Sequence, residues 1–266
     1  MIKYGFETVN EELDILNPIV KELDTFRTTI LTNLIEATSN NFKQGFKKVA
    51  FFEIGTVFDK KRNESKKISF IYSGDKEEES FSNNGRPKTI EFFDFSKKVL
   101  NSIGKFDLKV MEKIENSLIH PYQNADVLID GETVGFISKL HPNVANDYDL
   151  PDTFIAEIDF SKIKNDLVKV KDYSKFQASK RDLSLIVPKD MEYSRISHAI
   201  RTIEDEKIKQ FNLVDTYCDE KLGTNESLTI RFILQSNEKT LEEEDITSTM
   251  DNILEALSKK LGIGIR

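Results

Sequence analysis

Four polar residues in the last fifth of the chain have side chains suited to contact with single-stranded RNA: Asp215, Tyr217, Ser227 and Arg266. An exposed tyrosine ring can stack on an unpaired base, and an aspartate can accept hydrogen bonds from the Watson–Crick edge of guanine. A serine hydroxyl can donate or accept, and an arginine can bind a phosphate or a base. The four are therefore candidates for an RNA-binding site, and the alternative is an ordinary polar hairpin at a sheet edge.

Three other groups of reactive residue types have a simpler structural explanation. His120 and His141 are each followed by proline, which fixes an extended or turn geometry, and no carboxylate recurs at a matching offset. The acidic run 242–245 falls in the first turn of a predicted helix, where negative charge favours the helix dipole. The single Cys218 stands beside two acidic residues, which is not the electropositive setting of reactive thiols. We therefore predict no metal site and no catalytic nucleophile.

The four candidates lie within an alternation of strand and helix patterns that begins with a βα unit. Leu183, Leu185 and Val187 alternate as one face of a strand that stops at Pro188. Ser194 is then the predicted cap of a helix. The apolar stripe of this helix consists of Ile196, Ala199, Ile200 and Ile203.

A β-hairpin and a second helix follow. The segments 212–217 and 227–235 predict two strands around a glycine-containing turn. Thr240 and Glu243 have the spacing of a capping box, and the apolar-striped helix that follows should end at Gly262. With a short last strand, IGIR, the order βαββαβ is that of a ferredoxin-like fold.

This fold should gather the four candidates. We expect the end of the second strand, the start of the third, the end of the fourth and the start of the first to lie at one edge. If Leu228 and Ile230 face the helices, Ser227 faces the open side of the sheet. Asp215 and Tyr217 should share a face because they are two residues apart.

The N-terminal part predicts a helix that packs on a sheet. Segments 49–58 and 68–74 have strand patterns, and the charged stretch 60–67 between them predicts a hairpin tip. The polar stretch 75–89 predicts a surface loop. The helix is predicted from apolar residues at three- and four-residue spacing, namely Phe26, Ile30, Leu31, Leu34 and Ile35.

Length and patterning predict two domains. The 266 residues exceed what one core usually serves. The Lys-rich stretch 161–175 lacks sustained apolar periodicity and is the best linker candidate. We place the boundary near Val170, which gives domains of residues 1–169 and 170–266.

The composition and net charge limit the classes of function that the chain can have. Apolar residues make up 38% and charged residues 32%, and no apolar run approaches the roughly 18–20 residues of a membrane span. The N-terminus also lacks the pattern of a signal peptide, so we expect a cytoplasmic protein without membrane contact. The formal net charge of -8 is the reverse of a basic nucleic-acid footprint, so any RNA contact must be local.

The chain also carries a series of sequence blocks, in order, over nearly its whole length. They include NPIVKELDTFRTTILTNLIEA, FFEIGTVF, FFDFSKKVLNSIG, KRDLSLIV, ESLTIRF, KTLEEEDI and GIGIR. Together they resemble the C-terminal portion of the bacterial phenylalanyl-tRNA synthetase beta subunit. The resemblance implies an α+β chain: a class II synthetase-like antiparallel-sheet domain that has lost catalysis, followed by a ferredoxin-like anticodon-binding domain.

The same resemblance implies a function and partners. It implies a subunit that scaffolds the alpha subunit in an α2β2 heterotetramer and binds the anticodon of tRNA-Phe. Asp215, Tyr217, Ser227 and Arg266 would read the anticodon, principally its first base. ATP and Mg²⁺ would be used on the alpha subunit, with no cofactor bound by this chain. Because the family's beta subunit is far longer, we expect this chain to be a fragment.

The catalytic motifs of active class II enzymes are missing. Those enzymes hold the ATP α-phosphate with an arginine in a Phe-Arg-x-Glu strand, because an anionic transition state needs fixed positive donors. Here the strand 51–58 continues into Asp59, Lys60 and Lys61 without an Arg/Glu pair. Gln177 and Ser138 also replace a proline and a glycine of the family pattern, which affects local turn geometry. We therefore expect no amino acid activation by this chain.

A second hypothesis remains open. Ferredoxin-like domains also occur in free-standing interaction or regulatory proteins that bind RNA or a protein partner. A longer reading frame upstream and in frame would favour the ligase subunit over this alternative.

Overall fold

The computed structural model describes residues 25–114, 116–163 and 173–265 of the chain. The chain divides into two compact units, Met1–Asp166 and Leu167–Arg266, called unit 1 and unit 2 below. Each unit combines helices with one antiparallel sheet, so the predicted α+β class is confirmed. Val170 lies outside the described residues, and the boundary there stays a prediction.

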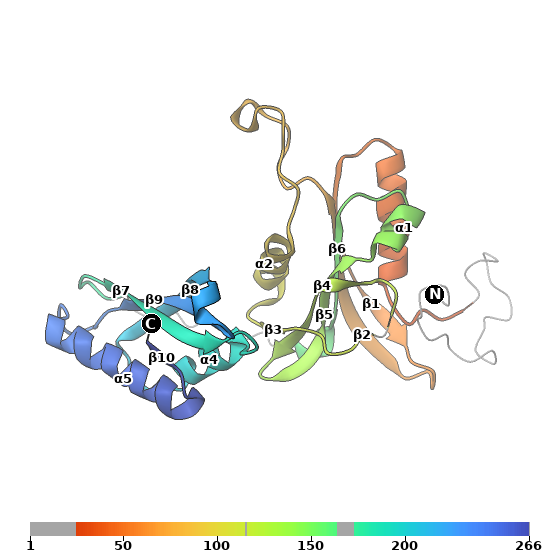
Figure 1. The fold of residues 1–266 in the computed structure, drawn as a ribbon. Helices are drawn as coiled ribbons and strands as arrows, with labels where there is room; N and C mark the ends of the chain where they lie inside the picture. Colours follow the sequence, from red (N-terminus) through yellow and green to blue (C-terminus); the bar gives the residue numbers. More distant parts are fainter. Residues whose placement is uncertain (1–24, 115, 164–172, 266) are drawn as a thin grey trace. The chain divides into compact units, whose positions relative to one another are not determined.

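Unit 1 is built on a six-stranded antiparallel sheet in the order β1-β2-β6-β5-β4-β3. Figure 1 shows the long β1–β2 hairpin, which forms one edge of this sheet. The strands are β1 (Lys48–Phe58), β2 (Glu64–Gly74), β3 (Asp107–Lys109), β4 (Ile119–Ile129), β5 (Glu132–Leu140) and β6 (Thr153–Asp159).

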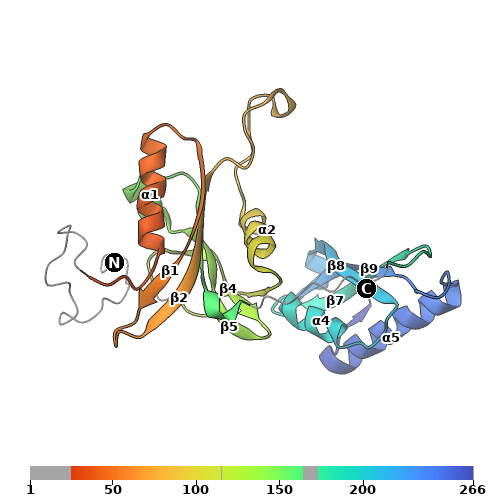
Figure 2. The ribbon, with the colours of Figure 1, turned by 180° about the vertical axis from the view of Figure 1, so that it is seen from behind.

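Helices cover both faces of this sheet. The two longer ones, α1 (Leu31–Lys43) and α2 (Phe92–Ile103), lie on opposite sides in Figures 1 and 2. One apolar core joins α1 and the short α3 (Pro142–Asp147) to the sheet. A second core joins α2 to the other face. Short 3-10 turns complete the unit at Phe81–Asn83 and Phe160–Lys162.

The first helix is shorter than its periodicity predicts. It begins at Leu31, and Phe26 lies before it with its ring centroid 4.6 Å from that of Phe58. A buried carboxylate fixes this start: Oε1 of Glu157 on β6 accepts hydrogen bonds from the Ile30 N–H at 3.0 Å and the Thr29 hydroxyl at 2.9 Å. Apolar spacing does not show this long-range contact.

The hairpin tip is also shorter than predicted. Residues 64–67 belong to β2, with Glu64 opposite Phe58. The turn closes within five residues because the Asp59 carboxylate accepts the N–H groups of Lys61 and Asn63, both at 2.8 Å. Charged residues continue into the strand because this end of the hairpin is solvent-exposed.

Unit 2 has a four-stranded antiparallel sheet in the order β10-β7-β9-β8. Its single core contains residues of both helices, which lie on one side of the sheet (Figure 2). This arrangement confirms the predicted ferredoxin-like fold. The elements are β7 (Ser179–Pro188), α4 (Tyr193–Arg201), β8 (Ile208–Tyr217), a 3-10 turn (Glu220–Leu222), β9 (Asn225–Leu234), α5 (Glu243–Leu261) and β10 (Gly264–Ile265).

Both predicted helix caps of unit 2 are wrong by two positions. Ser194 lies inside the first turn of α4, and its hydroxyl donates to the carboxylate of Glu192, the residue that precedes the helix. The capping box of α5 consists of Glu242 and Asp245. The pairs Thr240–Glu243 and Glu242–Asp245 both have the spacing of a capping box, and the structure uses the second. The Asp245 carboxylate also forms an ion pair with a lysine. The predicted end is confirmed, since Gly262 adopts the left-handed conformation at φ 67°.

Within the described part of the chain, no helix is both long enough and apolar enough to cross a membrane.

Candidate nucleic-acid interface

The candidate interface lies where β8 ends and β9 begins. Tyr217 is paired with Ser227 and Asp215 with Thr229, and directly opposite residues in an antiparallel ladder point to the same face. The intervening Leu228 belongs to the core beneath the helices. Asp215, Tyr217 and Ser227 therefore share the face of the sheet that no helix of unit 2 covers, called the open face below.

A β-bulge produces this arrangement. Leu213 is opposite Ile230 and Asp215 is opposite Thr229, so Val214 is an extra residue in β8. Without the bulge, Leu213 and Asp215 would share a face because they are two residues apart. With it, Leu213 packs against the core while Asp215 points to the open face. The sequence carries a signal for this, because the alternation changes phase at Val214: the apolar Phe211 and Leu213 precede it, and the polar Asp215 takes the next position of that series.

Tyr217 presents an aromatic ring at the end of β8. Its side chain is 41% exposed, and its hydroxyl donates to the Asp219 carboxylate at 3.0 Å. The same carboxylate accepts the Lys221 N–H at the start of the following 3-10 turn. These contacts hold the phenol end of the side chain toward the turn while the ring remains accessible. Asp215, two residues earlier, is exposed.

Ser227 has the predicted orientation but not the predicted access. Its side chain is only 2% exposed, because it lies between Tyr217 on β8 and Ile186 on β7. A base can reach this hydroxyl only if those neighbours move. Ser227 therefore contributes to the surface mainly because its small side chain leaves room for the two larger side chains on either side.

The predicted strand polarity at this edge is partly wrong. β7 runs antiparallel to both of its neighbours, so Pro188 at its end is opposite Asn225, and Gly264 at the start of β10 is opposite Ile186. The edge thus gathers the ends of β7 and β8 and the starts of β9 and β10. Arg266 lies outside the described residues.

The hairpin turn below the interface is tied to β7. The Lys189 ammonium donates to the Gly223 carbonyl at 2.9 Å, and the Lys189 N–H donates to Thr224 at 3.0 Å. Gly223 has φ 59°, which favours glycine. The exposed Cys218 lies in this turn, with its sulfur 3.5 Å from a carboxylate oxygen of Glu226.

The histidines assigned to structure do hold turns of unit 1. Nδ1 of His120 accepts the N–H groups of Tyr122 and Gln123, both at 3.1 Å, and burial lowers the pKa of this imidazole. Nδ1 of His141 accepts the Asn143 N–H at the start of α3. The Ser138 hydroxyl accepts the His120 N–H at 3.0 Å, so the serine side chain supports the irregular start of β4.

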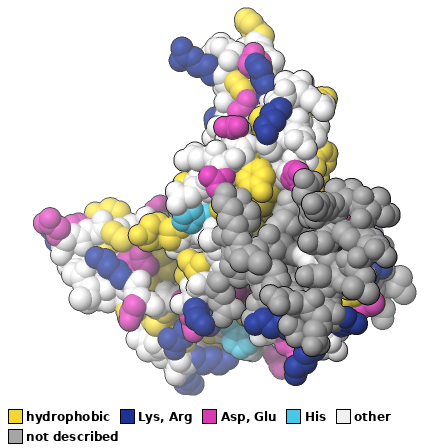
Figure 3. Space-filling model, turned by 90° about the vertical axis from the view of Figure 1, so that its right-hand side faces the viewer, with side chains coloured by type: hydrophobic (Ala, Val, Ile, Leu, Met, Phe, Trp, Pro, Cys, Tyr) yellow, Lys and Arg dark blue, Asp and Glu magenta, His cyan; other side chains and the backbone are white. Residues whose placement is uncertain are grey.

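Metal-binding side chains and surface charge are two further features of the described residues that bear on the candidate interface. Among the described residues, no group of three or more His, Cys, Asp or Glu side chains could hold a metal ion. In the face drawn in Figure 3, basic and acidic side chains are interspersed over the described part of the surface.

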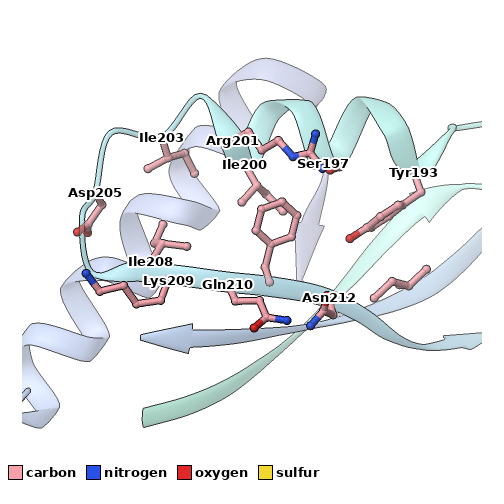
Figure 4. A pocket seen from close by; sticks show the side chains of 12 residues that line it. Tyr193, Ser197, Ile200, Arg201, Ile203, Asp205, Ile208, Lys209, Gln210 and Asn212 are labelled. Carbon is pink, nitrogen blue, oxygen red and sulfur yellow. The ribbon is translucent and has the colours of Figure 1, made fainter. Parts of the chain in front are cut away.

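A groove of about 510 Å³ lies elsewhere in unit 2, between α4 and β8. Its lining includes the apolar side chains Ile200 of α4 and Phe211 of β8. The Tyr193 hydroxyl points toward β8 (Figure 4). Burial raises the pKa of Tyr193. Phe211 and Leu213 line this groove from the helix-covered side, and Asn212 of the edge strand β8 also lines it, so the groove extends to the β8 edge of the open face.

Comparisons with known proteins cover both units. Residues 4–160 match a family model described as the phenylalanyl tRNA synthetase beta chain CLM domain. Residues 174–266 match the ferredoxin-fold anticodon binding domain.

Three curated relatives show how much of a longer protein the chain corresponds to. It is 48% identical to the phenylalanine–tRNA ligase beta subunit of Sulfurimonas denitrificans, over 99% of this chain and 34% of the relative. The corresponding subunits of Campylobacter jejuni and Helicobacter pylori strain J99 are 41% and 33% identical, over 99% of this chain and 33% and 34% of those relatives. The chain thus spans about a third of the length of the curated relatives it matches.

Proposed function

Because this chain belongs to the phenylalanyl-tRNA synthetase beta chain family, we propose that it is a non-catalytic part of a phenylalanine–tRNA ligase whose unit 2 binds the anticodon of tRNA-Phe. The observation that carries the proposal is that an exposed Tyr217 ring and the Asp215 carboxylate lie on the same open face, two residues apart on β8. A ring that stacks on an unpaired base beside an acceptor for its edge is the minimal arrangement for reading one nucleotide.

In this proposal the four predicted residues have different roles. Tyr217 stacks on the first anticodon base, and Asp215 accepts hydrogen bonds from its Watson–Crick edge. Ser227 packs between its neighbours and reaches the base only after they move. Arg266 binds a phosphate or a base from the end of the chain. The proposed domains are residues 1–169 and 170–266.

Unit 1 serves as a scaffold for the alpha subunit, in an α2β2 heterotetramer. The described part of its β1 strand does not offer a free arginine for an ATP phosphate. Arg27, which contacts this strand, has its guanidinium bound to the Glu53 carboxylate at 2.6 Å and to the Thr56 carbonyl at 3.0 Å. We propose that ATP and Mg²⁺ are used on the alpha subunit, in the cytoplasm, and that this chain adds binding energy for tRNA.

The test compares Tyr217→Ala with Tyr217→Phe in the ligase assembled from full-length subunits. The alanine variant should weaken tRNA-Phe binding by about 1–3 kcal/mol, the usual value of one base–aromatic stack. The phenylalanine variant keeps the ring and removes the hydroxyl that donates to Asp219, so it should bind almost normally. Asp215→Ala should instead relax discrimination at the first anticodon position.

The measurement is kcat/KM for wild-type tRNA-Phe and for tRNA with a substituted first anticodon base. Unchanged values for both Tyr217→Ala and Asp215→Ala would contradict the proposed site.

A further inference from the structure

The open face of unit 2 continues beyond Tyr217 as a surface of polar side chains in regular rows. The row next to the Tyr217–Ser227 pair consists of Asp215, Thr229 and Ser184, and the hydroxyls of the last two lie 3.0 Å apart. The row beyond it consists of Asn212, Arg231 and Asp182.

The outer row contains a rigid planar group. Nε of Arg231 donates to one oxygen of Asp182 at 2.8 Å, and Nη2 donates to the other at 2.7 Å. Both side chains are nearly half exposed, at 46% and 43%. This two-point contact fixes the plane of the guanidinium and compensates its charge. It also lowers the pKa of Asp182.

Asn212 completes the row on the other side of Arg231. It is exposed on the edge strand β8, opposite Arg231. Its amide carries both donors and an acceptor, which is the combination that the edge of a base requires.

The spacing of the rows suits successive bases of one RNA strand. Every second residue along a strand advances by about 6.6 Å, so Arg231 lies roughly 13 Å from Ser227 along β9. RNA-binding domains with a comparable four-stranded sheet stack two or three bases on its open face. Guanidinium planes serve as stacking surfaces as aromatic rings do.

We propose that Asn212 and Arg231 form a second base-binding position of the same anticodon interface. Arg231 stacks on an unpaired base of the same strand, two rows along the sheet from the one bound by Tyr217, and Asn212 hydrogen-bonds to the edge of that base. This proposal rests on the proposed function and extends it from one nucleotide to a short single strand. Continuity with the Tyr217 position identifies the occupant as the same RNA loop.

The chain offers a matched control on the opposite face. Arg181 precedes Asp182 on β7, and its guanidinium pairs with Glu243 of α5 at 2.7 Å. Arg181→Ala therefore removes a comparable surface ion pair without touching the open face. A loss of binding shared by Arg181→Ala and Arg231→Ala would reflect the fold and would overturn the proposal.

The experiment measures tRNA-Phe binding to the assembled ligase. Arg231→Ala should weaken binding about five-fold or more, the lower range for one stacked base. Arg231→Lys should lose a similar factor, because lysine keeps the charge but has no planar fork. Asn212→Ala, which breaks no ion pair, should weaken binding in a way that depends on the identity of one loop base. The dependence on salt should not change, because Asp182 already compensates Arg231.

Three results separate the possibilities. If Arg231→Ala lowers the salt slope by about 1 while Arg231→Lys binds normally, the arginine contacts a phosphate, and the stacking proposal is overturned. Normal binding by Arg231→Ala and Asn212→Ala, with a loss for Tyr217→Ala, overturns this proposal alone. Normal binding by Tyr217→Ala as well overturns the proposed function.

Discussion

The two units place their polar groups on different kinds of sheet. In unit 1 helices cover both faces, and the carboxylate of Glu157 is 9% exposed and accepts three hydrogen bonds within the sheet and at the start of α1. In unit 2 no described helix covers one face, and apart from the buried Ser227 its polar residues point to solvent or pair with one another. A covered sheet uses polar groups to fix its packing, whereas an open sheet can present them to a ligand.

This contrast predicts where substitutions act. Polar residues of the covered sheet should affect unfolding and leave RNA contact unchanged. Polar residues of the open face should affect RNA contact and change unfolding little.

The largest effect should come from Glu157→Ala. The substitution leaves the Thr29 hydroxyl, the Ile30 N–H and the Ser69 hydroxyl without their acceptor in a buried site. Each buried donor without a partner costs about 1–3 kcal/mol, so we expect unit 1 to lose at least about 3 kcal/mol of unfolding free energy. Amide hydrogen exchange would measure the two units separately, and protection in unit 2 should not change.

A surface carboxylate provides the control for this variant. Glu132 on the neighbouring strand β5 pairs with Lys162 at 3.0 Å and is 70% exposed. Glu132→Ala should change stability by well under 1 kcal/mol. Equal losses of unfolding free energy in the two variants would show that the buried position of Glu157 does not increase its contribution to stability.

A smaller effect should separate two serines that make similar bonds on the two kinds of sheet. Ser69 on β2 is fully buried and donates to Glu157 at 2.8 Å. Ser184 on the open face lies 3.0 Å from the Thr229 hydroxyl. Ser69→Ala should cost about 1–2 kcal/mol and Ser184→Ala about 0.5 kcal/mol, because water replaces the lost partner only on the open face. Urea unfolding of both variants would test the order, and a larger loss in Ser184→Ala would reverse the contrast.

Local sequence patterns predicted most of unit 2. Alternation at Leu183–Val187 and in β9, together with the end of α5 at Gly262, was sufficient for the ferredoxin-like order, because these elements are adjacent in sequence and have clear periods. The same parity argument placed Asp215 and Tyr217 on one face.

What the sequence did not predict depends on contacts between distant residues. The start of α1 is set by Glu157, more than a hundred residues away. The burial of Ser227 follows from two larger side chains on neighbouring strands. The expected polarity of β7 and β10 at the interface was wrong because β7 and β8 both pair antiparallel with β9, so they run in the same direction and their ends meet at one edge. The ion pair of Arg231 with Asp182 needed the register of β7 against β9.

The smallest effect concerns pH and again involves a polar group of the covered unit. Burial, followed by the charge of Lys139, lowers the pKa of His120 below its usual 6.5, while Asp152 opposes this shift. Neutral His120 accepts two backbone N–H groups through Nδ1. Because the folded-state pKa is below the unfolded one, the unfolded chain binds more protons between the two values, and stability falls as pH drops below 6.5. His120→Gln removes the titrating group. The difference in unfolding free energy between wild type and variant should therefore be constant above pH 7, and toward pH 5 the wild type should lose stability relative to the variant. Urea unfolding of unit 1 across this range tests the sign, and parallel curves for the two proteins would contradict it.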